Sequence, residues 1–113
     1  MDVKAQRAEQ TRNSIEQIVQ GIVGWVQSPA YIPQWVTSAD LYHELQIVLF
    51  GKVYADYSCP SPFWPCTARS LGRRLAQHKE HIQQWLETEG ITMRWRLDTH
   101  RKALIYYFTK SRL

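Results

Sequence analysis

Arginine side chains gather at the start of one amphipathic segment. Arg69, Arg73 and Gln77 recur every four residues, so in a helix they form one row, with Ser70 and Arg74 beside it. A guanidinium group carries a permanent charge and a fork of donors that matches phosphate oxygens and guanine edges. This spacing predicts recognition of an anionic polymer, and a solvated surface face is the alternative.

The same segment has an apolar side that would hold it on a domain. Side chains suited to burial recur at steps of three and four, which predicts one continuous helix over residues 67–87. Thr67 is a suitable N-cap, and Glu89-Gly90 is a suitable stop. The expected buried side consists of Leu71, Leu75, His78, Ile82 and Leu86.

A β-hairpin is expected directly after this helix. Residues 91–97 alternate between apolar and polar types, which is the pattern of a half-buried strand. Residues 98–102 form a polar connection of hairpin length, and residues 103–109 are rich in the aromatic and branched types of a second strand. A basic helix followed by a hairpin over 91–109 with a basic tip predicts a winged helix that binds DNA.

The distribution of charge agrees with this expectation. Residues 1–66 carry four Lys or Arg and six Asp or Glu, whereas residues 67–113 carry ten basic and four acidic residues. The net charge of +4 therefore arises in the half that holds the basic helix and the hairpin. Such an asymmetry favours a densely anionic partner, because neutralising phosphates releases condensed counterions.

Composition favours one ordinary globular domain. The chain has 113 residues, of which 44% are hydrophobic and 21% charged, so it can close a single core. No apolar run approaches membrane-spanning length, and the first residues do not resemble a secretory signal. A soluble, cytoplasmic protein without a membrane partner is expected.

Neither a metal site nor an enzyme is expected. Cys59 and Cys66 lie too far apart in sequence for a zinc knuckle or redox motif, so two reduced thiols are predicted. His78 and His81 could complete a zinc site, but the spacing disfavours it. None of the five glycines lies in a phosphate-loop or dinucleotide spacing, and no local Ser-His-Asp or Cys-His arrangement is evident.

The first half of the chain predicts two further helices. Residues 1–11 are expected to be a flexible terminus, and a helix is expected over 12–27, whose apolar stripe faces the core or, less favourably, a second copy. Gly21 and Gly24 would let another helix approach closely. An extended connector precedes a helix over 38–50, capped by Thr37 or Ser38 with Asp40 in its first turn and ended by Gly51. Residues 52–66, with three prolines, are expected to form a long loop.

The predicted fold is an α+β winged helix-turn-helix, with three main helices and a C-terminal β-hairpin wing, in one domain over residues 12–113. Two motifs resemble the C-terminal winged helices of phage and plasmid replicative primase-helicases. These are Val36-Thr37-Ser38-Ala39-Asp40-Leu41-Tyr42 and Ser70-Leu71-Gly72-Arg73-Arg74-Leu75, followed by Gly90-Ile91 and a basic hairpin. The resemblance covers residues 35–109 and implies DNA binding in replication of a mobile element. The long proline-rich loop departs from that group, so a small regulator is also considered.

The expected function is non-catalytic binding of double-stranded DNA, without a cofactor. The expected contacts are Thr67, Arg69, Ser70, Arg73, Arg74 and Gln77 on the helix, and Arg94, Arg96, His100, Arg101 and Lys102 on the wing. One alternative is a protein-interaction module anchored by exposed Trp35, Phe63 and Trp64. The other is a homodimeric repressor paired through the helix at 12–27.

Overall fold

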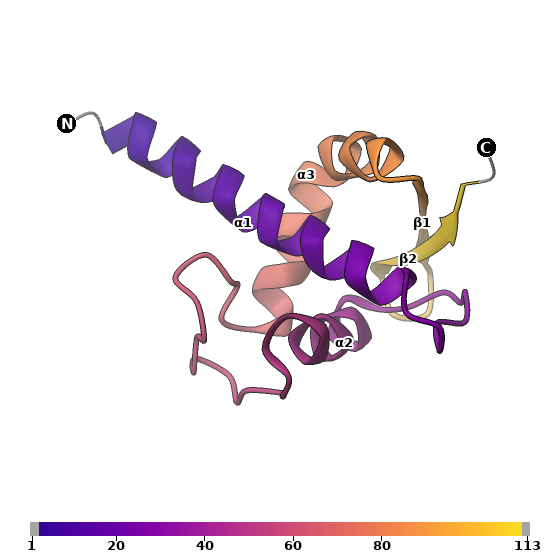
Figure 1. Ribbon diagram of the computed structural model, residues 1–113. Coiled ribbons are helices and arrows are strands. Elements are labelled where there is room, and N and C mark those ends of the chain that lie inside the picture. The colour runs from indigo at the N-terminus through magenta and orange to yellow at the C-terminus, as the bar shows by residue number, and fades with distance from the viewer. Residues whose placement is uncertain (1–2, 112–113) are drawn as a thin grey trace.

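Three helices are followed by a two-stranded hairpin in the computed structural model, which describes residues 3–111 (Figure 1). This is the α+β order of a winged helix and confirms the predicted fold class. The elements are α1 (Val3–Val26), α2 (Ser38–Phe50), α3 (Ala68–Thr88), β1 (Ile91–Asp98) and β2 (Ala103–Lys110).

Helix α1 begins at Val3, so it starts earlier than the expected residue 12 and includes residues 3–11 of the expected flexible terminus; residues 1 and 2 lie outside the described part. This stretch is rich in Ala, Gln, Glu and Arg, which are good helix formers even without an apolar face. Further along α1, Ile18 and Ile22 of the apolar stripe are fully buried in the domain core, and Val23 is partly buried against it. The expected packing of this stripe on its own domain is confirmed.

Helix α2 crosses α1 closely and has well-defined ends. A Cβ on Gly24 would lie 2.8 Å from Val48 Cγ1, so this glycine permits the close approach that the sequence suggested. At the start of α2, Thr37 Oγ1 accepts a hydrogen bond from the Asp40 amide at 3.1 Å, and the Asp40 carboxylate accepts one from the Thr37 amide at 3.4 Å. Gly51 ends the helix in the left-handed conformation, with φ of 78°.

Helix α3 is not continuous, contrary to the prediction for residues 67–87. His78 has φ of −120° and ψ of 18°, which breaks the helix into two segments that run in different directions (Figure 1). The Lys79 ammonium donates a hydrogen bond to the Ala76 carbonyl at 3.2 Å, next to the break. Leu75 before the break and Ile82 after it are both fully buried. Periodicity does not reveal the break, because His78 continues the same three-and-four-residue series.

The hairpin has the predicted strands and an additional partner. β1 and β2 pair antiparallel from Ile91 opposite Lys110 to Asp98 opposite Ala103. Val36, in the connector between α1 and α2, exchanges two backbone hydrogen bonds with Tyr106 of β2, at 2.8 and 2.9 Å. The connector is therefore fixed to the wing and places neighbouring side chains against it.

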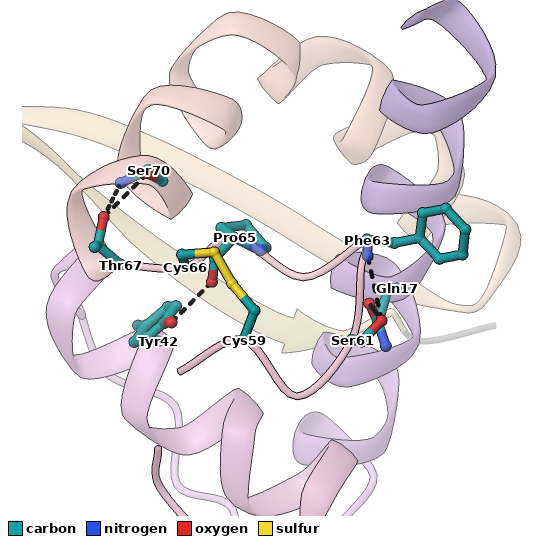
Figure 2. Close-up of a disulfide and its surroundings, with 9 residues drawn as sticks. All are labelled: Gln17, Tyr42, Cys59, Ser61, Phe63, Pro65, Cys66, Thr67 and Ser70. Carbon is teal, nitrogen blue, oxygen red and sulfur yellow. Dashed lines mark hydrogen bonds between the residues drawn. A yellow bond between two sulfur atoms is a disulfide. The ribbon is translucent and has the colours of Figure 1, made fainter. Parts of the chain in front are cut away.

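The loop between α2 and α3 is closed by a disulfide between Cys59 and Cys66, so the prediction of two reduced thiols is wrong (Figure 2). Turns in the proline-rich segment bring the two Cα atoms to 5.1 Å, within the usual range for a disulfide. The Tyr57 amide also donates to the Cys66 carbonyl at 3.0 Å across the same loop. Sequence separation alone does not show this chain reversal.

Helices α1 and α2 both hold this loop in place (Figure 2). The Tyr42 hydroxyl of α2 donates to the Pro65 carbonyl at 2.8 Å, and the Ser61 hydroxyl donates to Gln17 Oε1 of α1 at 3.1 Å. Trp64 is only 2% exposed and stacks on Tyr42, so its predicted role as an exposed anchor is wrong. The sequence does not reveal this, because an aromatic side chain in a loop can pack either into the domain core or against a partner protein. Within the described chain, no helix is long and apolar enough to cross a membrane.

Candidate nucleic-acid interface

The first segment of α3 is positioned by its cap and its apolar side. Thr67 Oγ1 accepts a hydrogen bond from the Ser70 amide at 3.0 Å, which confirms Thr67 as the N-cap (Figure 2). Leu71 and Leu75 are fully buried on the inward side. The opposite side of this segment is therefore turned away from the core.

Arg69, Arg73 and Gln77 are all exposed on this outward side, as their spacing predicts. The row ends at the break at His78, so the exposed basic segment is about 15 Å long. The second segment, residues 79–88, contains one Lys and two Glu and carries no such row. A basic recognition surface on α3 is consequently confined to its first segment.

The two hydroxyl residues of the expected site serve mainly to start the helix. Besides accepting from the Ser70 amide, the Thr67 hydroxyl donates to Ser70 Oγ at 3.0 Å. The Ser70 hydroxyl proton remains available for a ligand, because Ser70 Oγ acts as the acceptor in that contact. Of Thr67 and Ser70, only Ser70 therefore has a hydroxyl proton that it can donate to a ligand.

Arg74 is separated from the row. Its side chain is half-buried and lines a cavity together with Ser14 of α1 and Trp64 of the loop. The sequence correctly predicted that Arg74 lies to one side of Arg73, but it could not predict that α1 and the loop enclose it.

The outer face of the wing combines two arginines with two aromatic rings. Arg94 and Arg96 are exposed, and strand pairing places Arg94 directly opposite Tyr107. The Arg96 guanidinium carbon lies 4.4 Å from the centre of the Trp35 ring, and Trp35 lies 5.3 Å from Tyr107. The role of Tyr107 was missed from sequence, although its alternation with buried Tyr106 and Phe108 indicates an outward side chain.

The wing tip contains three exposed cationic or titratable side chains: His100, Arg101 and Lys102. Asp98 Oδ1 accepts a hydrogen bond from the His100 amide at 3.0 Å, and its other oxygen lies 3.7 Å from Arg101. Asp98 therefore shapes the turn and partly offsets its charge. Lys102 is in the left-handed region, with φ of 52°.

Among residues 8–111, no carboxylate pairs with the arginines of the first α3 segment. The contact between Arg101 and Asp98 is the one ion pair among residues 8–111, whose side chains the structure describes. Arg69, Arg73, Arg94 and Arg96 consequently retain their charge for a ligand. At exposed positions these groups suit phosphate contacts, which account for most of the salt-dependent affinity for DNA.

A second surface has the opposite character. A cavity of about 670 Å³ is bordered by aromatic residues and by the carboxylates Asp40 and Glu44 of α2. Trp25, Tyr31 and Trp35 contribute the aromatic part. The carboxylates would repel phosphates, so this cavity is not included in the nucleic-acid interface.

The described side chains contain no cluster of three or more His, Cys, Asp or Glu residues that could hold a metal ion. Cys59 and Cys66 cannot act as thiolate ligands while they are bonded to each other. His78 lies near Arg74, whose positive charge disfavours a cation there.

No family model matches this chain, and no curated protein or solved structure shows significant similarity to it.

Proposed function

We propose that this protein is a non-catalytic binder of double-stranded DNA, acting as a replication-associated or regulatory factor of a phage, plasmid or other mobile element. One observation carries the proposal: the exposed row of Arg69, Arg73 and Gln77 on a short helix that its apolar side fixes to the core. The fork of an arginine can read guanine or bind phosphate from such a position. The link to mobile elements rests on the resemblance described above.

The wing supplies the second part of the proposed interface. The sugar-phosphate backbone would be bound by Arg94 and by the tip residues His100, Arg101 and Lys102. These contacts would add affinity without sequence preference. Arg96 would contribute less to phosphate binding, because its guanidinium already stacks on the Trp35 ring. Arg74 lies outside this interface, because it lines a cavity with Ser14 and Trp64.

A titration of labelled generic duplex at low and high salt tests the proposal. Binding that weakens steeply with salt is expected, because each phosphate contact releases counterions. Absence of binding even at low salt would refute it. A cytoplasmic location remains a prediction, and the disulfide between Cys59 and Cys66 argues against a strongly reducing compartment.

A protein-interaction module is the second candidate. Phe63 is 38% exposed, Ile32 is 74% exposed, and the aromatic cavity beside Trp35 could receive a partner side chain. Trp64 no longer supports this alternative, because it is buried. A homodimeric repressor also remains a prediction; it would give a dimer mass in solution and bind palindromic sites.

A further inference from the structure

A small polar cavity lies between α1, the loop after α2 and the start of α3. Its volume is about 300 Å³, at the lower end of the range of small-molecule sites, which begins at about 300 Å³. Three segments that are distant in sequence form its walls. The lining residues are Gln10, Thr11, Ser14, Pro62, Phe63, Trp64, Pro65 and Arg74.

Ser14 is the first unusual feature of this cavity. It is 4% exposed, and its hydroxyl has no hydrogen-bond partner within the described protein. A serine inside a helix can usually satisfy its hydroxyl by bonding to the carbonyl four residues earlier, but Ser14 does not. A buried hydroxyl without a partner destabilises the fold, so an acceptor bound in the cavity would remove a real cost.

Arg74 is the second feature. Arg74 lines the same cavity, and its guanidinium has no carboxylate partner among residues 8–111. Burial lowers the pKa of the neighbouring His78, and the nearby Arg74 and His81 lower it further, so the neutral imidazole is favoured there and Arg74 supplies the positive charge that lines this cavity. A neighbouring cavity of about 420 Å³, bordered by Arg12 and both histidines, shares Thr11 with the first.

The Trp64 indole N–H has no assigned role in binding a ligand in this cavity. Its Nε1 is buried without a geometrically good hydrogen-bond partner. The Trp64 ring stacks on Tyr42, with ring centres 5.6 Å apart, and burial raises the pKa of Tyr42. Trp64 provides a wall of the cavity, and the loop that carries it is tied to α1 through Ser61 and Gln17 (Figure 2).

We propose that this cavity binds a phosphate group, with Arg74 as its charged ligand and Ser14 as a neutral donor. A guanidinium fork and a hydroxyl can donate to different oxygens of one tetrahedral anion, which would give the buried Ser14 hydroxyl a partner. The phosphate belongs either to the end of a nucleic acid or to a free phosphate compound. The site does not depend on the proposed DNA binding by Arg69 and Arg73.

NMR titration of the folded protein with inorganic phosphate tests this proposal. We expect saturable shifts at the Arg74 side-chain Nε–H and at the amides of Thr11 and Ser14. Arg74→Gln should weaken phosphate binding by roughly tenfold or more, since a hydrogen bond to a charged group is lost. Ser14→Ala should weaken it less and leave the fold at least as stable.

Arg73→Gln is the matched control, because it removes the same charge from the adjacent, exposed position. It should leave phosphate binding unchanged while weakening duplex binding. Equal loss in the two glutamine variants would overturn the proposal, since it would indicate a diffuse field. Binding of acetate as tightly as phosphate, or no saturation by phosphate in the millimolar range, would also overturn it.

Two further arms identify the source of the phosphate and guard against misfolding. A duplex with 5′-phosphates that binds the wild type more tightly than its dephosphorylated form, but binds Arg74→Gln no more tightly, identifies a nucleic-acid end. Equal affinity of the two duplexes, together with saturable inorganic phosphate, identifies a free phosphate compound. Arg74→Lys keeps the charge without the fork, so intermediate phosphate binding is expected from a folded protein.

Discussion

Gly72 of α3 packs directly against Ser38 at the start of α2. A Cβ on Gly72 would lie 2.9 Å from Ser38 Oγ and 3.3 Å from its Cβ. Helix α2, fixed at its start by the Thr37 cap, therefore determines how close the basic segment of α3 can come to the core. The absence of a side chain at Gly72 has a structural reason, although glycine is a poor helix former.

Gly72→Ala should destabilise the protein. In an open helix this change would stabilise by about 1 kcal/mol. Here we expect a net loss of about 1–3 kcal/mol, because overpacking outweighs the gain in helix propensity. Urea unfolding of the single variants and of Gly72→Ala with Ser38→Ala measures the coupling. The double variant should recover part of the loss, and a more stable Gly72→Ala protein would contradict the packing.

Replacement of Arg73 by Ala should weaken binding to duplex DNA and relax base preference. Replacement of Arg101 and Lys102 together should weaken all duplexes alike and lower the salt slope by about 1 for each lost phosphate contact. Fluorescence anisotropy at several salt concentrations measures both effects. Lys52→Ala is a suitable control, because it also removes one positive charge. Lys52 follows the C-terminal end of α2 and is not part of the proposed interface. Unchanged binding in both basic variants would dispose of the interface.

Lys102→Gly should separate stability from binding. The residue adopts φ of 52°, a region that is unfavourable for a side chain, so glycine should stabilise the hairpin by about 1 kcal/mol. The same change removes a cation from the wing and should weaken DNA binding. His100→Gly, in the same turn but without positive φ, should give no such gain in thermal unfolding. A lower melting temperature for Lys102→Gly would refute the argument.

Reduction of the disulfide between Cys59 and Cys66 should lower stability by about 2–3 kcal/mol, the value expected from loop-closure entropy for a short loop. Thermal unfolding with and without a thiol reductant measures the change. The protein with Ser at both positions should behave as the reduced wild type and should ignore the reductant. Titration of two free thiols in protein purified without reductant would contradict the bond.

Alkaline pH should destabilise the protein in a defined range. Burial raises the pKa of Tyr31 and of Tyr106 to about 12, from an ordinary value of 10.0. Both phenols therefore stay protonated in the folded state after the unfolded chain begins to ionise. Their contribution is complete below pH 10.0 and is lost as pH rises from 10.0 to about 12.

Urea midpoints across this range measure the alkaline loss. Tyr31→Phe should reduce it, although the hydrogen bond from the Tyr31 hydroxyl to the Phe108 carbonyl is lost as well. Tyr57→Phe is the control, because Tyr57 is 83% exposed. A tyrosinate absorbance titration in which all six tyrosines ionise together near their ordinary pKa would rule out the effect.

Local signals in the sequence were sufficient for several elements. The Thr37 and Thr67 caps, the Gly51 stop and the alternation in the hairpin each depend on neighbouring residues, and each is present. The exposed row of Arg69 and Arg73 follows from the same helical spacing. These features are determined by backbone geometry over a few residues, so a linear pattern is enough to identify them.

Tertiary structure decided the features that join distant segments. It broke α3 at His78, buried Trp64, closed the Cys59–Cys66 loop and enclosed Arg74 beside Ser14. Each outcome depends on which surfaces meet when the helices pack, and the spacing of residues along the chain does not contain that information. The sequence by itself therefore determined the basic face of this protein, whereas packing decided which of its arginines remain on that face.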